Sequence, residues 1–181
     1  GNNIDNLIIE IDNVEIPILD GSSKEFSEKI LKTGLIEQNS YKKFYKIKKD
    51  IRYFDMESGC EIIAIPSENF QIDVTIDYNS KTLAVQNSTL NNILDFGKEI
   101  ASSRTFCFLH ELEELLGNNL IKGGDINNAI VVVENEINNS NLSILAKQFG
   151  KNIIKVSEEG ILDNLELRYK NEVSRHKLLD I

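Results

Sequence analysis

A histidine and an aspartate lie near the end of the chain with helical spacing. The stretch Ser174–Ile181 reads SRHKLLDI and contains His176, one of two histidines in the sequence, and Asp180. Positions i and i+4 of a helix lie one turn apart on the same face, so these side chains should point the same way. Imidazole nitrogen and carboxylate oxygen are both ordinary zinc ligands. The pair predicts part of a metal site, although this spacing is more often an exposed surface pair and a catalytic zinc needs a third protein ligand.

Other residues with chemical potential give weaker signals. His110 lies among acidic residues, and we interpret it as a surface residue. Lys122–Asp125 (KGGD) is a glycine turn before a buried strand; glycines let a ligand approach the backbone, but a simple loop is the better explanation. The sequence has no GxGxxG or GxxxxGK[ST] nucleotide-binding motif and no GxSxG nucleophile motif.

The composition limits the class of protein. Apolar residues make up 41% of the 181 residues, which is typical of a folded domain, and the net charge of −9 argues against nucleic acid as a partner. Cys60 and Cys107 have no CxxC spacing and are typical of free thiols in a reducing compartment. No apolar run approaches the roughly 20 residues that span a bilayer. We therefore expect a cytoplasmic protein without a membrane span.

Strand-like and helix-like patterns occur in groups along the chain rather than in regular alternation. This order favours an α+β fold with helices packed on one face of a sheet, and the polar stretch Gln38–Lys43 is a candidate domain boundary. Period-2 patterns predict strands, and 3.6-period patterns with capping residues predict helices. The predicted strands are Asn6–Ile11, Val14–Leu19, Phe44–Phe54, Cys60–Pro66, Phe70–Tyr78, Arg104–Phe108, Ala129–Val133 and Ile153–Val156, and the predicted helices are Ser22–Gly34, Ser88–Ser102, Leu109–Leu116, Leu142–Phe149 and one capped by Ser174.

Four stretches taken together are more specific than any one of them. In their order and approximate spacing they resemble the UDP-3-O-acyl-N-acetylglucosamine deacetylases (LpxC), which are zinc enzymes of lipid A synthesis. The polar segment Glu134–Lys170 resembles the version found in Bacteroidota, where the deacetylase is often fused to a 3-hydroxyacyl-ACP dehydratase. The four stretches are Ile4–Phe26, Ser103–Phe108, Asn119–Val132 and Arg175–Asp180.

The resemblance implies two similar α+β domains, each a β-α-α-β sandwich of a sheet backed by helices, with the active site between them. Residues 1–38 would form the C-terminal part of the first domain, and residues 39–181 most of the second. An inserted β-α-β unit at about residues 104–133 would form an apolar passage for the acyl chain. The resemblance also implies a monomer that takes a UDP-sugar with an acyl chain as its small-molecule substrate.

The resemblance assigns roles to individual residues. His176 and Asp180 match two of the three ligands of Zn²⁺, and Thr105 matches a catalytic threonine whose hydroxyl stabilises the oxyanion. Lys177 matches a lysine that holds the nucleotide sugar, and Tyr78 replaces a family phenylalanine near the uridine. The residues implied to bind substrate along the acyl passage are Phe106, Phe108, Leu112 and Gly124.

Part of the implied machinery is missing from this sequence. The family's first zinc histidine and the glutamate that acts as general base would lie upstream of Gly1, and a further histidine would lie downstream of Ile181. We therefore expect an internal fragment of a larger enzyme, inactive by itself. Two alternatives stay open: a non-catalytic interaction domain, and part of a bifunctional protein with dehydratase activity.

Overall fold

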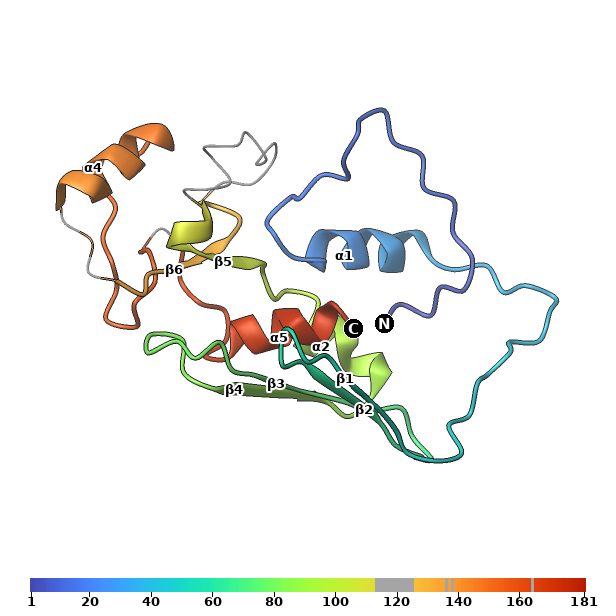
Figure 1. Cartoon of the computed structure of the whole chain (residues 1–181). Coiled ribbons are helices and arrows are strands. Elements are labelled where there is room, and N and C mark those ends of the chain that lie inside the picture. Colours follow the sequence, from blue (N-terminus) through green and yellow to red (C-terminus); the bar gives the residue numbers. More distant parts are fainter. Residues whose placement is uncertain (113–125, 136, 138, 164) are drawn as a thin grey trace.

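The computed structural model describes residues 1–112, 126–135, 137, 139–163 and 165–181 (Figure 1). Helices and short strands are mixed along the chain, which confirms the α+β class. In the described residues, β1 pairs with β2 and β3 with β4 in antiparallel ladders, and β5 pairs with β6 in parallel. The elements are α1 (Lys24–Thr33), β1 (Ile51–Phe54), β2 (Glu61–Ala64), β3 (Ile72–Ile76), β4 (Gln86–Leu90), the 3-10 helix η1 (Ile93–Asp95), α2 (Phe96–Glu99), β5 (Phe106–Phe108), β6 (Ile130–Val132), α4 (Asn139–Gln148) and α5 (Glu172–Leu179).

Helix α5 packs along the β3–β4 ladder, as Figure 1 shows. The side chains of β3 alternate: Ile76 is buried, whereas Asp73 and Thr75 are exposed. Leu90 of β4 and Leu178 of α5 belong to one buried cluster. The ladder therefore buries one face against α5, as the predicted packing of helices on one sheet face requires.

The parallel β5–β6 pair has a core on each face. Phe108 and Val132 pack with Val173 of α5 in one cluster. Cys107 and Val131 belong to the other cluster, together with side chains of α4. Because alternate residues of a strand point to opposite faces, β5 presents its phenylalanines toward α5 and its cysteine toward α4.

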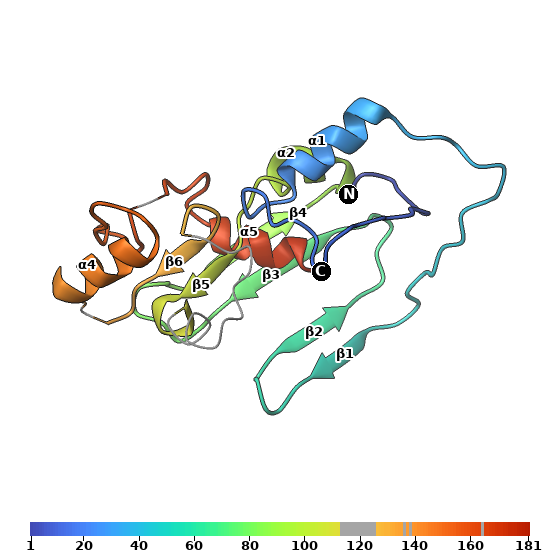
Figure 2. The ribbon, with the colours of Figure 1, turned by 90° about the horizontal axis from the view of Figure 1, so that it is seen from above.

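The turn that precedes α1 lies against the segment that leads into β5. The Thr105 N–H donates to the carbonyl oxygen of Gly21 at 2.7 Å, and the Ser23 hydroxyl donates to the carbonyl oxygen of Ala101 at 3.1 Å. Figure 2 shows α1 beside α2 on this side of the molecule. These hydrogen bonds join residues more than 75 positions apart, directly before β5.

Two predicted strands and half of a predicted helix are wrong. Residues 6–19, all of which the structure describes, contain no strand, and their backbone pairs with no strand of a described sheet. Most of their apolar side chains are exposed. Residues 86–90 form β4 instead of the start of a helix at Ser88. The apolar stripe is helical in spacing, but Asn87 and Thr89 donate side-chain hydrogen bonds to Asp73 across the ladder, and this pairing with β3 overrides the local pattern.

Other elements form with shifted bounds. The helix predicted from Ser22 begins at Lys24, and the Ser22 hydroxyl donates to Asp20 instead of completing a capping box. Helix α5 begins at Glu172, so Ser174 lies inside it. Residues 109–112 are helical, and the remainder of the helix predicted to Leu116 lies outside the described residues.

The strand predicted at Ile153–Val156 is reduced to an isolated bridge between Val156 and Leu162. Of the stretch predicted as a strand from Phe44, only β1 forms. The division at residues 38 and 39 and the inserted unit at about residues 104–133 stay predictions.

Two glycines with nearly the same backbone conformation provide a test of the turn before α1. Gly21 has φ +82° and Gly34 has φ +83°. A Cβ atom on Gly21 would overlap the carbonyl oxygen of Asn128, whereas a Cβ atom on Gly34 would meet nothing within 4 Å. Gly34→Ala should cost about 1–2 kcal/mol for the left-handed conformation alone. Gly21→Ala should cost about 1–3 kcal/mol more, because the backbone itself must move.

Urea unfolding of the two variants in the complete protein measures this difference. Equal losses of stability would show that the close approach of Gly21 to Asn128 does not contribute.

Candidate functional site

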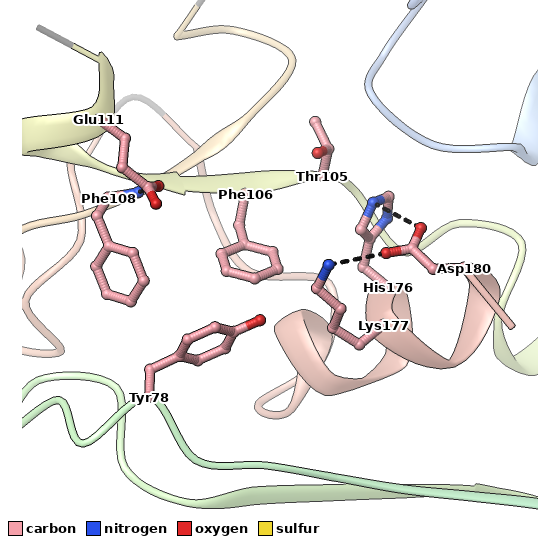
Figure 3. Close-up of a pocket in the computed structure, with 8 residues that line it drawn as sticks. All are labelled: Tyr78, Thr105, Phe106, Phe108, Glu111, His176, Lys177 and Asp180. Atoms are coloured by element: carbon pink, nitrogen blue, oxygen red, sulfur yellow. Dashed lines mark hydrogen bonds and ion pairs between the residues drawn. The ribbon is translucent and has the colours of Figure 1, made fainter. Parts of the chain in front are cut away.

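One open pocket of about 410 Å³ collects most of the predicted site residues (Figure 3). Tyr78 follows β3, Thr105 precedes β5, and three residues come from α5 and its C-terminal cap. Segments far apart in sequence therefore meet at one place because β5 and β3 both pack near α5. The lining residues are Tyr78, Thr105, Phe106, Phe108, Glu111, His176, Lys177 and Asp180.

His176 is oriented by a backbone carbonyl. Its Nδ1 lies 3.1 Å from the carbonyl oxygen of Ser103. A carbonyl oxygen only accepts, so Nδ1 donates in this hydrogen bond and Nε2 is the ring nitrogen left to face Asp180. The Nε2 atom lies 3.8 Å from Asp180 Oδ1, and the imidazole is mostly buried. A histidine that ligates a metal usually donates its other N–H in this way.

The His176–Asp180 pair fits two positions of a zinc site. Two ligand atoms at about 2.0–2.2 Å from one tetrahedral ion stand about 3.3–3.6 Å apart, so the observed 3.8 Å is slightly wider than that separation. The other carboxylate oxygen of Asp180 accepts from Lys177 Nζ at 3.0 Å, which leaves Oδ1 facing His176. Within the described residues, no group of three or more His, Cys, Asp or Glu side chains could hold a metal. This part of the chain thus brings together two side chains, His176 and Asp180, of a chemical type that binds zinc.

Lys177 is held as a cation between a carboxylate and an aromatic ring. Its Nζ lies 5.6 Å from the centroid of the Phe106 ring. Burial on its own lowers the pKa of Lys177, but the hydrogen bond and charge of Asp180, with smaller contributions from Tyr78 and Glu111, outweigh burial and raise it. A fixed positive charge of this kind suits a phosphate group.

Three aromatic side chains form the apolar side of the pocket. Tyr78 contacts Phe106 and Phe108 edge to face, with ring centroids 5.7 and 5.5 Å apart. Burial raises the pKa of the Tyr78 hydroxyl, an effect that the nearby Lys177 charge opposes. His110 is exposed, as predicted, and stacks on Phe108 at 5.6 Å. The cluster offers flat apolar surface beside the Lys177 cation.

Two predicted residues lie elsewhere, and one pocket residue was missed. Leu112 is buried in the cluster that includes Val131 and does not line the pocket, so its place in an acyl passage stays a prediction. Gly124 lies outside the described residues. Glu111 lines the pocket and its carboxylate accepts from the Phe108 N–H at 2.8 Å. A glutamate three residues after the N-cap residue is half of a capping box, and that spacing could have located it.

The comparison with protein families agrees with these features. The family model described as UDP-3-O-acyl N-acetylglycosamine deacetylase, LpxC, matches residues 1–149. The chain belongs to this family. The resemblance inferred from the sequence is thus confirmed.

Curated relatives of the chain fall into two kinds. The bifunctional enzyme LpxC/FabZ of Porphyromonas gingivalis is 41% identical over 178 residues, which are 98% of this chain and 38% of the relative. The corresponding bifunctional enzyme of Chlorobaculum tepidum is 39% identical over 184 residues, 100% of this chain and 39% of the relative. The UDP-3-O-acyl-N-acetylglucosamine deacetylase of Actinobacillus succinogenes is 37% identical over 185 residues, 99% of this chain and 52% of the relative. The chain therefore spans between about two fifths and half of these relatives. In the part of the chain that the structure describes, no helix is long and apolar enough to cross a membrane.

The two cysteines test which way β5 faces. Cys107 lies opposite the pocket, and burial raises the pKa of its thiol to about 11, whereas Cys60 is exposed. At pH 8 only about one Cys107 side chain in a thousand is a thiolate. Iodoacetamide should therefore modify Cys60 quickly and Cys107 very slowly, with the Cys107 rate rising as the pH approaches 11.

Mass spectrometry of Cys60→Ser and Cys107→Ser variants separates the two reactions. Rapid modification of Cys107 at pH 8 would contradict its burial against the α4 side of β5.

Proposed function

We propose that the complete protein to which this chain belongs removes the acetyl group from a UDP-3-O-acyl-N-acetylglucosamine in lipid A biosynthesis, with Zn²⁺ as cofactor. The observation that supports this reaction is the placement of His176 Nε2 and Asp180 Oδ1, 3.8 Å apart, in one pocket with Thr105. The family and the names of relatives such as the Actinobacillus deacetylase support the same reaction.

The residues of this chain divide the work between metal binding and charge stabilisation. His176, through Nε2, and Asp180, through Oδ1, would supply two zinc ligands. Zinc, when bound, polarises a carbonyl group and lowers the pKa of water toward roughly 7. The Thr105 hydroxyl would donate a hydrogen bond to the amide oxygen as negative charge develops on it.

The remaining pocket residues match the three parts of the substrate. The Lys177 ammonium would pair with the diphosphate, and the Tyr78 ring would pack near the uridine. Phe106 and Phe108 would line the start of an acyl passage. A chain with net charge −9 repels a nucleotide diphosphate at long range, so a local cation such as Lys177 is needed to bind it.

A finer part of the proposal concerns the setting of the enzyme. We infer that it works in the cytoplasm as a monomer. The free thiols of Cys60 and Cys107 fit a reducing compartment. Sedimentation of the complete protein measures the oligomeric state.

A second activity in the complete protein has its own support. Relatives with the bifunctional name are 39–41% identical to this chain, against 36–37% for those named as deacetylases alone. We infer that the complete protein is of the bifunctional kind. Its mass and an assay for 3-hydroxyacyl-ACP dehydratase test this inference, and a protein without dehydratase activity would overturn it.

Removal of the imidazole should abolish the reaction. In the complete protein, His176→Ala should lose zinc and release no measurable acetate from the UDP-sugar, because one of its ligands is gone. The isolated 181 residues, whose described part supplies two of the proposed ligands, should bind zinc weakly and show no turnover. Acetate release is measured by a coupled assay and zinc by elemental analysis. Wild-type turnover by His176→Ala would remove the assignment.

Removal of the threonine hydroxyl should lower the reaction rate without changing the amount of bound zinc. Thr105→Ala should lower kcat by about 10²–10³-fold, the usual effect of losing one oxyanion donor, with bound zinc unchanged. Thr105→Ser keeps the hydroxyl and should retain most of the activity. Thr33→Ala on α1 is a matched control, since the Thr33 hydroxyl donates only to its own helix. Full activity in Thr105→Ala would show that this hydroxyl does not stabilise charge.

A further inference from the structure

Glu172 is a buried carboxylate that does not line the pocket. Its side chain is 0% exposed and it accepts four hydrogen bonds. Arg104 supplies three of them, from its backbone N–H, Nε and Nη2 at 3.0, 2.8 and 3.1 Å, and the Arg168 N–H supplies the fourth at 2.6 Å. Burial on its own raises the pKa of Glu172, but the hydrogen bonds and charge of Arg104 outweigh it and the pKa is lowered. Glu172 is therefore a buried anion whose two carboxylate oxygens both accept hydrogen bonds from the protein.

Helix α5 and the segment before β5 are joined at two points, one helical turn apart. Glu172 and His176 are four residues apart on α5, and Ser103 and Arg104 are consecutive. The Arg104 N–H donates to Glu172 at 3.0 Å, and the Ser103 carbonyl oxygen accepts from His176 at 3.1 Å. The Ser103–Arg104 peptide unit thus donates its N–H to the buried carboxylate of Glu172. The carbonyl oxygen of the same unit accepts from the imidazole that is proposed as a zinc ligand.

Thr105 directly follows this attachment. Its N–H donates to Gly21 and its carbonyl oxygen accepts from the Ile130 N–H at 2.8 Å. The backbone that carries Thr105 is therefore tied to α5, to the turn before α1 and to β6. Any shift of Arg104 relative to Glu172 moves both the Ser103 carbonyl and the start of the Thr105 residue.

A second arginine extends the attachment to the turn before α1. Arg168 Nη2 lies 2.8 Å from Asp20 Oδ2, and its Nη1 donates to the Ser102 carbonyl oxygen at 2.7 Å. Its backbone N–H is the donor to Glu172 already described. Asp20, Arg168, Glu172 and Arg104 form one connected charge network around residues 102–105.

We propose that Glu172 is a positioning residue of the zinc site. By holding Arg104, it keeps the Ser103 carbonyl against His176 Nδ1, so that Nε2 faces Asp180, and it keeps Thr105 in line with the pair. The consequence for catalysis rests on the proposed deacetylase function, whereas the consequence for the His176 ring does not. The competing explanation is that the Arg104–Glu172 pair serves stability alone.

The two explanations differ for a neutral replacement of the pair. Glu172→Gln alone leaves Arg104 buried without its counter-charge and should lower Tm. Arg104→Met with Glu172→Leu removes both charges, and replacement of a buried ion pair by apolar residues of similar volume is often neutral or stabilising. The double variant should therefore recover most of the Tm. It still lacks the side-chain acceptor for the backbone N–H of residue 104, so the site should remain impaired if Glu172 positions it.

The experiment uses the complete protein with zinc and a metal-free sample of it. In the metal-free sample, ¹⁵N NMR of the histidine rings, with His176→Ala for assignment, reports whether Nδ1 carries the proton. Chelator competition gives the zinc affinity, and steady-state kinetics give kcat and KM. The double variant should show a mixture of tautomers, zinc affinity weaker by about 10–100-fold, as for loss of an orienting partner, and a lower kcat with little change in KM.

Arg175→Met is the matched control on the same helix. Arg175 donates to the Glu99 carbonyl oxygen at 2.6 Å and packs over Tyr169, away from the Ser103 attachment. It should lower Tm without changing the tautomer or the zinc affinity. A double variant with the wild-type tautomer and zinc affinity would overturn the positioning role.

Two other results of this experiment also have a defined meaning. If the double variant does not fold, Glu172→Asp replaces it, because this change keeps the charge but withdraws the carboxylate from the Arg104 N–H; a wild-type tautomer there would also overturn the inference. If the wild-type protein releases no acetate, the proposed function fails, and the tautomer in the metal-free samples still decides the role of Glu172.

Discussion

The buried ion pair between Glu172 and Arg104 is the interaction on which the pocket depends. Unpaired burial of a carboxylate is costly, so Glu172 can lie at 0% exposure only where donors surround it. Those donors belong to Arg104, in the segment before β5, and to Arg168, in the segment before α5. The pair therefore dictates which part of the chain lies against the first turn of α5. The second turn of that helix, with His176, then faces the Ser103 carbonyl.

The proposed nucleotide-diphosphate substrate requires local positive charge in an acidic chain. A pocket in a chain of net charge −9 attracts cations more readily than a diphosphate. Asp180 can serve both a metal ion and a fixed lysine cation because its two oxygens face different partners. Its Oδ2 accepts from Lys177, and its Oδ1 faces His176. The same carboxylate thereby holds a cation beside the aromatic wall and remains available to a metal. Glu111 adds negative charge on the other side and further favours the charged form of Lys177.

The pocket residues were predicted better than the elements that surround them, and most of them came from the resemblance to the family rather than from local spacing. The i, i+4 relation placed His176 and Asp180 on one face because helix geometry is fixed by the backbone alone. The helix predicted at Ser88–Ser102 was half wrong because side-chain and backbone pairing with β3 is a long-range effect that a local stripe does not contain. The burial of Glu172 was also beyond the sequence, since nothing in its immediate neighbours shows that Arg104, 68 residues earlier, would neutralise it.

The network also explains why the two proposed zinc ligands, His176 and Asp180, can have a defined geometry within the described part of the chain. A metal site is organised either by the ion or by the protein around it. Here the orientation of the His176 ring follows from the Ser103 carbonyl, which is fixed by Arg104, Glu172 and the contact of Thr105 with Gly21. None of these contacts involves a metal. The two side chains proposed as zinc ligands are therefore oriented by hydrogen bonds within the protein, which do not depend on a bound ion.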